Sequence, residues 1–156
     1  MVACGGPQVH SASRLIGLLD AQGRERDVQI DRVTIVGIVA AGCPHAEEYL
    51  SARLPQMREI LGGEGAQFIL VDESNLPIAS RASATEIQAT VRQGTLVRYD
   101  RSAVLLKTYP LQYQGGLPTT LFIAANGHIV TRILGVAEEA DYVRDLEMAR
   151  KFKAGP

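Results

Sequence analysis

Residues 34–61 constrain the fold more than any other part of this 156-residue chain. The stretch opens with a continuous run of Val and Ile, which is typical of a strand buried on both faces of a sheet. Cys43 and Pro44 follow, and proline is favoured at the first position of a helix because its missing N–H costs nothing there. Beyond them, apolar residues recur at helical spacing with charged residues between them: Ala46, Tyr49, Leu50, Leu54, Met57, Ile60 and Leu61. The sequence therefore predicts that Cys43 lies where a buried strand ends and an amphipathic helix begins.

A cysteine at such a junction is well placed for thiol chemistry. The free N–H groups and the positive dipole end of a helix start stabilise a thiolate, and the thiolate is the form that attacks disulfides and binds metals. The alternative is that Cys43 is an inert buried residue. His45 would favour the thiolate when protonated, although the helix start disfavours a protonated imidazole. An exposed histidine without a role is the alternative for His45.

Composition narrows the function classes. A hydrophobic content of 46% over 156 residues predicts one domain with its own core. A net charge of -1 and an aromatic content of 5% offer neither a basic nor a base-stacking surface for nucleic acid. No apolar run is long enough to span a membrane. The two cysteines, Cys4 and Cys43, are too few for a disulfide scaffold and lack zinc-site spacing. We expect a monomer without a cofactor.

The N-terminus bears on location. Val2-Ala3-Cys4 resembles the end of a bacterial lipoprotein signal, although the charged and apolar parts of such a signal are absent. If the resemblance holds, Cys4 carries a lipid that tethers the protein to a membrane of the bacterial cell envelope, on the periplasmic side. The alternative is a polar lead-in with a chance cysteine and a cytoplasmic protein. Residues 1–13 are predicted to be a flexible lead-in and residues 14–152 the folded domain.

The rest of the chain alternates strands and helices. Turn residues, caps and periodicity predict the following elements: a hairpin of strands 15–19 and 24–30 around Gly23, a second buried strand at 67–71 parallel to the first, helices at 83–94 and 102–109, a short strand at 95–99, a strand at 117–124, a return strand at 128–134 after Asn126-Gly127, and a helix at 138–152. The last helix is predicted to bury Tyr142, Val143, Leu146 and Ala149. This order predicts an α/β domain with a mixed central sheet and helices on both faces.

These elements resemble the thioredoxin-like superfamily, and most closely the bacterial extracytoplasmic redoxins of the TlpA/ResA kind. The resemblance rests on three segments: Cys-Pro-His-Ala at 43–46, Gly-Leu-Pro-Thr-Thr at 116–120, which is similar to the family's cis-proline loop, and the hairpin at 126–135. It covers residues 14–150, and the three motifs together are more specific than each alone. The resemblance implies a thioredoxin-like fold with an N-terminal hairpin and a helix and short strand inserted at 83–99.

The resemblance also implies a site. Its catalytic residues would be Cys43, Pro44, His45 and Pro118, and its substrate-binding residues Leu117 and Thr119. In the family, the proline is cis beside the cysteine, and the backbone before it pairs with an extended substrate by strand addition. The alternative for Pro118 is an ordinary trans proline at a strand start. The implied partners are thiols and disulfides of proteins or small molecules.

Four positions depart from the family pattern. Ala46 stands where the family has its second cysteine, which normally resolves the mixed disulfide. Gly42 replaces an aromatic residue, and Gly37 stands where thioredoxins carry a buried acid. Ala40 stands where the peroxidase branch has a threonine. The chain therefore lacks part of the residue set that the family uses for dithiol exchange and part of the set that it uses for peroxide reduction.

Several explanations of these departures stay open. The chain is a natural single-cysteine redox protein, a redox-silent binding module for extended peptides, or a protein in which Ala46 is an engineered replacement. We favour the first, because some redoxin-like sequences carry one cysteine before proline with a downstream Tyr and Pro, as Tyr49 and Pro55 do here. A peroxidase-like redoxin and a copper site of Cys43, His45 and His128 are less favoured alternatives.

Overall fold

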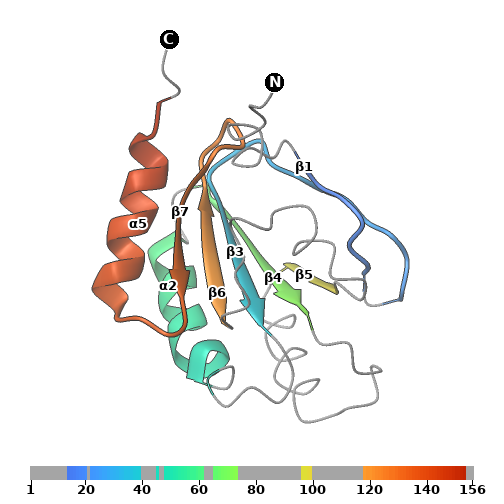
Figure 1. Ribbon diagram of the computed structural model, residues 1–156, viewed down its shortest axis with the longest axis horizontal. Helices are drawn as coiled ribbons and strands as arrows, with labels where there is room; N and C mark the ends of the chain where they lie inside the picture. Colours follow the sequence, from blue (N-terminus) through green and yellow to red (C-terminus); the bar gives the residue numbers. More distant parts are fainter. Residues whose placement is uncertain are drawn as a thin grey trace, which may run out of the picture.

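A mixed sheet forms the centre of the computed structural model, which describes residues 14–20, 22–39, 45, 48–61, 65–73, 96–99 and 118–153. In these residues the sheet has five strands in the order β5-β4-β3-β6-β7 (Figure 1). The strands are β3 (Thr34–Val39), β4 (Gln67–Asp72), β5 (Leu96–Tyr99), β6 (Thr119–Ile123) and β7 (Ile129–Leu134). β3, β4 and β5 run parallel, and β6 is antiparallel to both of its neighbours. The predicted mixed α/β architecture is confirmed.

Hydrophobic side chains pack on both faces of the sheet. Because successive residues of a strand point to opposite faces, Ile35 and Val39 join one core cluster while Val36 and Ile38 join another. The first cluster is covered by α2 (Leu54–Leu61) and α5 (Glu139–Lys151), which lie on the same side of the sheet in Figure 1. The second cluster is covered by the hairpin of β1 (Arg14–Leu15) and β2 (Val28–Gln29). The helices predicted at 83–94 and 102–109 lie outside the described residues.

The helix predicted after β3 has an irregular first half. His45 and Glu48 are helical, a π-helical turn η2 follows at Tyr49–Arg53, and α2 begins at Leu54. Pro55 explains the irregularity: it has no N–H to donate to the carbonyl four residues earlier, so the helix widens just before it. The N–H of Leu54 donates to the carbonyl of Tyr49, five residues back. The predicted apolar face is present, with Tyr49, Leu50, Leu54 and Met57 all buried.

The buried stripe of α5 differs from the prediction at one position. Tyr142, Leu146 and Ala149 are buried as expected, but Val143 is 37% exposed. The fourth member of the stripe is Asp145, because helical geometry buries positions i, i+3, i+4 and i+7 whatever their side chains. The buried Asp145 carboxylate accepts hydrogen bonds from the Thr131 hydroxyl at 3.2 Å and from Nε of Arg144 at 3.0 Å. These donors compensate the charge.

Both predicted hairpins are present. In the first, the N–H of Gly23 donates to the Asp20 carbonyl at 3.0 Å, and Gly23 has φ 81°. In the second, the N–H of Gly127 donates to the Ala124 carbonyl at 2.9 Å, and Gly127 has φ 89°. Glycine adopts this left-handed conformation without a Cβ penalty. Pairing in the first hairpin runs from Arg14 and Gln29 to the bridge between Leu19 and Glu25, but its regular strands are limited to Arg14–Leu15 and Val28–Gln29.

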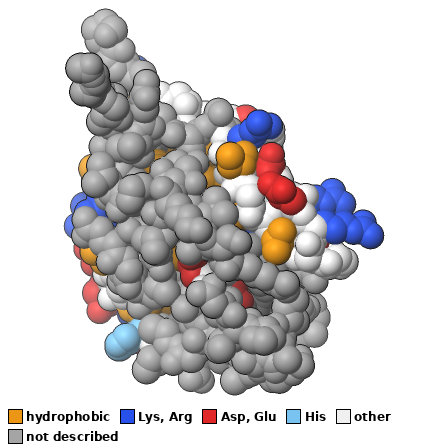
Figure 2. Space-filling view, turned by 45° about the vertical axis from the view of Figure 1, so that its right-hand side comes forward, with side chains coloured by type: hydrophobic (Ala, Val, Ile, Leu, Met, Phe, Trp, Pro, Cys, Tyr) orange, Lys and Arg blue, Asp and Glu red, His pale blue; other side chains and the backbone are white. Residues whose placement is uncertain are grey.

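The described surface shows no single-sign patch on the face seen in Figure 2. Basic and acidic side chains lie next to one another there, with small hydrophobic areas between them. Among the helices in the described part of the chain, none has the length and apolar character needed to cross a bilayer.

Candidate functional site

Three segments meet at one edge of the sheet. β7 is antiparallel to β6, and β6 is antiparallel to β3, so the carboxyl ends of β3 and β7 lie at the same edge as the start of β6. His45 follows β3, Pro118 precedes β6 and Gly135 follows β7. The N–H of Gly135 donates to the Pro118 carbonyl at 2.7 Å, which ties two of these segments together. In open α/β sheets, ligands bind in the crevice outside the carboxyl ends of the strands.

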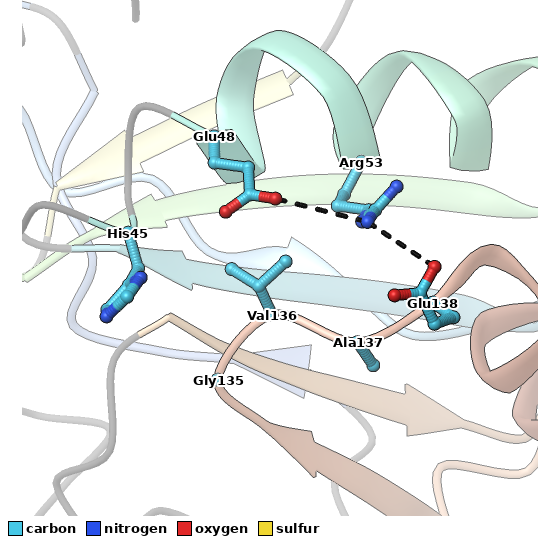
Figure 3. A pocket seen from close by; sticks show the side chains of 7 residues that line it. All are labelled: His45, Glu48, Arg53, Gly135, Val136, Ala137 and Glu138. Atoms are coloured by element: carbon cyan, nitrogen blue, oxygen red, sulfur yellow. Dashed lines mark ion pairs between the residues drawn. The ribbon is translucent and has the colours of Figure 1, made fainter.

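A pocket of about 390 Å³ opens at this edge (Figure 3). One wall comes from the helical segment after β3 and the other from the connection between β7 and α5. Its lining consists of His45, Glu48, Arg53, Gly135, Val136, Ala137 and Glu138. The volume lies within the range of small-ligand sites in proteins. This pocket is the candidate functional site.

Ionisable side chains dominate the pocket. Nη2 of Arg53 lies 3.7 Å from a Glu138 carboxylate oxygen and 4.0 Å from a Glu48 carboxylate oxygen, as the dashed lines in Figure 3 show. Nη1 of Arg53 donates to Oε1 of Gln56 at 3.2 Å. The Arg53 side chain is 16% exposed, whereas those of Glu48 and Glu138 are 54% and 84% exposed. The Arg53 guanidinium therefore lies deeper in the pocket, and the carboxylates of Glu48 and Glu138 face the solvent.

A buried hydroxyl occupies the space beside Gly37. The Tyr49 side chain is fully buried, and its hydroxyl lies 2.7 Å from the Thr120 hydroxyl. A Cβ at position 37 would come within 2.6 Å of that tyrosine oxygen, a distance that requires the neighbour to move. No acidic side chain fits at position 37 while Tyr49 keeps this place. Burial raises the pKa of Tyr49 well above its ordinary value, so the phenol stays neutral.

A second tyrosine supports the pocket wall. The Tyr142 hydroxyl, on α5, accepts a hydrogen bond from the N–H of Ala137 at 3.1 Å. Burial raises the pKa of Tyr142 as well, against the opposing effect of the Ala137 N–H. Because Ala137 lines the pocket, α5 fixes the position of this wall through a neutral phenol.

The structure places only part of the predicted site. His45 is exposed and lies on the pocket wall, and Pro118 is buried beside Gly135. Thr119 is buried within β6, opposite Ile38. Cys43, Pro44 and Leu117 lie outside the described residues, as does Ala46. Their roles stay predictions.

Most of the pocket lining was not predicted from the sequence. Glu48 and Arg53 are charged positions of the predicted helix, and the residues from Gly135 to Glu138 join the predicted return strand to the last helix, so the sequence pattern assigns none of them to a site. The predicted strand order contains a signal for this site. A hairpin whose first strand pairs antiparallel with β3 has a second strand that runs parallel to β3. The residue after β7 must therefore lie near the residue after β3. The charges that meet there follow from that topology.

The two histidines of the copper alternative, His45 and His128, do not come together. His128 stacks on Phe152 with ring centroids 4.3 Å apart and lies just before β7, whereas His45 shares the pocket with Gly135, just after β7. A six-residue strand separates these two ends by about 20 Å. Among the residues that the structure describes, no group of three or more His, Cys, Asp or Glu side chains could hold a metal ion.

Comparison with solved structures identifies the fold. A Chlorobium tepidum protein assigned as the thiol:disulfide interchange protein DsbE is 19% identical, with a TM-score of 0.67 over 89% of this chain and 94% of that one. StoA of Bacillus subtilis is 14% identical, with a TM-score of 0.63 over 86% and 98%. The exposed lipoprotein thioredoxin Etrx1 of Streptococcus pneumoniae is 19% identical, with a TM-score of 0.60 over 86% and 98%.

These similarities define the class of fold. At such low identity they concern the fold alone, and they show that the chain has the thioredoxin-like fold, as predicted. No protein-family model matches the sequence, and no curated protein matches it at a significant level.

Proposed function

We propose that this chain is a thiol redox protein that acts on disulfides of proteins or small molecules through the single thiolate of Cys43. The observation that carries the proposal is the pocket at the carboxyl edge of the sheet, with His45 in its wall. Cys43 is two residues before His45, so the chain keeps their Cα atoms within about 7.6 Å of each other. Proteins with this fold include a thiol:disulfide interchange protein and a thioredoxin, which supports the same chemistry here.

The proposed reaction is thiol–disulfide exchange. The Cys43 thiolate attacks one sulfur of a substrate disulfide, forms a mixed disulfide with that half, and releases the other half as a thiolate. Ala46 has no thiol to resolve the mixed disulfide. A second thiol from solution therefore attacks it, restores the Cys43 thiolate and leaves with the bound half as a new disulfide. The protein's own redox state is unchanged over this cycle.

The remaining predicted site residues have supporting roles in this proposal. Pro44 begins the helix whose N–H groups stabilise the thiolate. Pro118, in the cis form, lies beside Cys43, and the backbone of Leu117 pairs with an extended substrate. Thr119 continues the same strand into β6. The hydrogen bond from Gly135 to the Pro118 carbonyl supports this arrangement, because it holds the proline segment next to the pocket.

The reactivity of Cys43 tests the proposal. In a Cys4→Ser background, we expect the rate of alkylation by iodoacetamide to titrate with a pKa below the value of about 8.5 for a free thiol, because a helix start stabilises the thiolate. The measurement is the alkylation rate between pH 5 and pH 10, followed by mass spectrometry. A pKa at or above that of a free thiol would contradict the catalytic role.

Partner capture separates redox chemistry from simple binding. Partners held by Cys43 should be released by reductant and lost in a Cys43→Ser variant. Retention of the same partners by Cys43→Ser would instead identify a binding module that docks extended segments.

We further propose an envelope location with a lipid on Cys4. The motivating sequence is Val2-Ala3-Cys4, and one protein with this fold is an exposed lipoprotein. Mass spectrometry of the protein from its native source checks the idea. An unmodified Cys4 preceded by an intact Met1 would refute it.

A further inference from the structure

The mouth of the pocket is acidic although its interior holds a cation. Two carboxylates, those of Glu48 and Glu138, face the single guanidinium of Arg53 among the lining residues. The guanidinium is mostly buried and already lies near both carboxylates, whose own side chains are more than half exposed. A ligand that enters from solvent therefore meets Glu48 and Glu138 before it reaches Arg53.

Neither ion pair is a direct hydrogen bond. The separations of 3.7 Å and 4.0 Å between Arg53 Nη2 and the two carboxylates exceed hydrogen-bond length. Both carboxylates keep unused acceptor sites toward the solvent, since an ionised carboxylate has about four. Glu138 uses one of its sites to accept a hydrogen bond from the N–H of Asp141 as the cap of α5, and the remaining sites can accept hydrogen bonds from a second cation.

The two carboxylates approach from opposite walls. Glu48 comes from the helical segment after β3, and Glu138 is the N-cap residue of α5. Figure 3 shows both carboxylates directed toward the same space around Arg53. A single ammonium or guanidinium group at the mouth could therefore reach both walls.

We propose that Glu48 and Glu138 are specificity-determining residues that favour polypeptide disulfides with a lysine or arginine next to the reacting cysteine. The inference rests on the proposed function, because it takes Cys43 as the attacking group two residues before the pocket wall. The pocket volume of about 390 Å³ accommodates one long side chain beside His45. Charges at the rim mainly change the rate of encounter, so the preference should weaken as salt screens them.

The test compares three peptides, each with one cysteine in a mixed disulfide with 2-mercaptoethanol. The peptides differ only in the residue next to that cysteine. The neighbouring residue is Lys, Gln or Glu. In the Cys4→Ser protein at low salt, we expect adducts to form about tenfold faster with the Lys peptide than with the Glu peptide, from two near-surface charge contacts. Glu48→Gln and Glu138→Gln should each reduce this ratio about threefold. Gln keeps an acceptor oxygen, so Glu138→Gln preserves the cap of α5.

Asp31→Asn is the matched control. It removes the same charge from an exposed side chain that pairs with Arg32 at the amino end of β3, the opposite end of the strand. It should leave the ratio unchanged. Equal rates for the three peptides, a faster Glu peptide, or an equal effect of Asp31→Asn would overturn the inference.

A comparison of two small disulfides shows the source of the selectivity. Cystamine carries ammonium groups beside its disulfide, and 2-hydroxyethyl disulfide carries none. A faster reaction of Cys43 with cystamine means that any neighbouring cation suffices, whereas equal rates mean that peptide docking is required.

The proposed function and this inference fail in different ways. If iodoacetamide and all three peptides react with Cys43 but without discrimination, the redox function stands and the charge preference is wrong. If no peptide forms an adduct, the redox function fails. The charge preference is then decided in Cys43→Ser by NMR titration: larger shifts of the Gly135 and Ala137 amides with the unactivated Lys peptide support it, and equal shifts with the Glu peptide refute it.

Discussion

Replacing Ala46 with cysteine should allow the protein to release a bound partner without attack by a thiol from solution. Residues three apart on a helix share a face, so Cys43 and a cysteine at position 46 would lie close enough to bridge if their Cα atoms are about 4.4–6.8 Å apart. The new thiol attacks the mixed disulfide and releases the partner. Because the helix start stabilises the Cys43 thiolate, the reduced form is favoured and the dithiol couple is oxidising.

Turnover with a model peptide disulfide is the measurement, with an external thiol present as the reductant that restores the dithiol from the bridge. Release of the bound half should be at least about tenfold faster than in the parent with about 1 mM external thiol, because a tethered thiol acts at an effective concentration well above that. Cys43→Ser with Ala46→Cys is the control and should show no turnover. Failure to form the bridge would mean that Cys43 does not lie at the helix start. A bridge without turnover would place the defect at Gly42, Gly37 or the Leu117-Pro118 loop.

Truncation of Tyr49 to alanine should lower the free energy of unfolding by about 3–5 kcal/mol, the range for loss of a large buried aromatic side chain. Tyr49 is fully buried, and its hydroxyl is paired with that of Thr120. Its removal leaves both a cavity and an unsatisfied hydroxyl. Urea unfolding followed by circular dichroism gives the value. A loss below about 1 kcal/mol would mean that the helix after β3 repacks freely.

Gly37 and Tyr49 should be energetically coupled. Gly37→Ala alone should cost about 1–3 kcal/mol through overpacking, since the added methyl would lie 2.6 Å from the tyrosine oxygen and 3.2 Å from a ring carbon. Tyr49→Phe removes the closer of these two atoms. The double variant should therefore lose about 0.5–2 kcal/mol less than the sum of the single variants. Strict additivity would contradict the close approach.

Alkaline pH provides an independent check on Tyr49. Its folded-state pKa is raised by burial, whereas the unfolded chain loses the proton near pH 10. The contribution of the neutral Tyr49 phenol to the free energy of unfolding is therefore fully present below about pH 10. It is lost as the pH rises, by up to about 1.4 kcal/mol per pH unit for one group. Tyr142 acts in the same direction, so Tyr49→Phe should remove part of the loss between pH 10 and pH 11. An identical pH dependence in parent and variant would contradict the burial argument.

Local patterns in the sequence were sufficient for most of the elements. The Val and Ile run predicted β3 as a fully buried strand, because such side chains fit a strand covered on both faces. Helical periodicity predicted the buried face from Tyr49 to Met57. Glycine predicted both hairpins, since Gly23 and Gly127 adopt the positive φ that their turns require. Each of these depends on residues close together in the chain.

The sequence alone thus determined the strands, the hairpins and the thioredoxin-like order of elements, while the tertiary structure decided the composition of the pocket. Arg53 meets Glu138 only because β7 returns parallel to β3. The carboxylate of Asp145 is compensated at its buried position in α5 because Thr131 of β7 and Arg144 supply donors. The Tyr49 hydroxyl fills the space at Gly37 because β6 places Thr120 opposite that glycine. Periodicity records which side of an element is buried, whereas the pairing of distant side chains depends on how the elements pack in three dimensions.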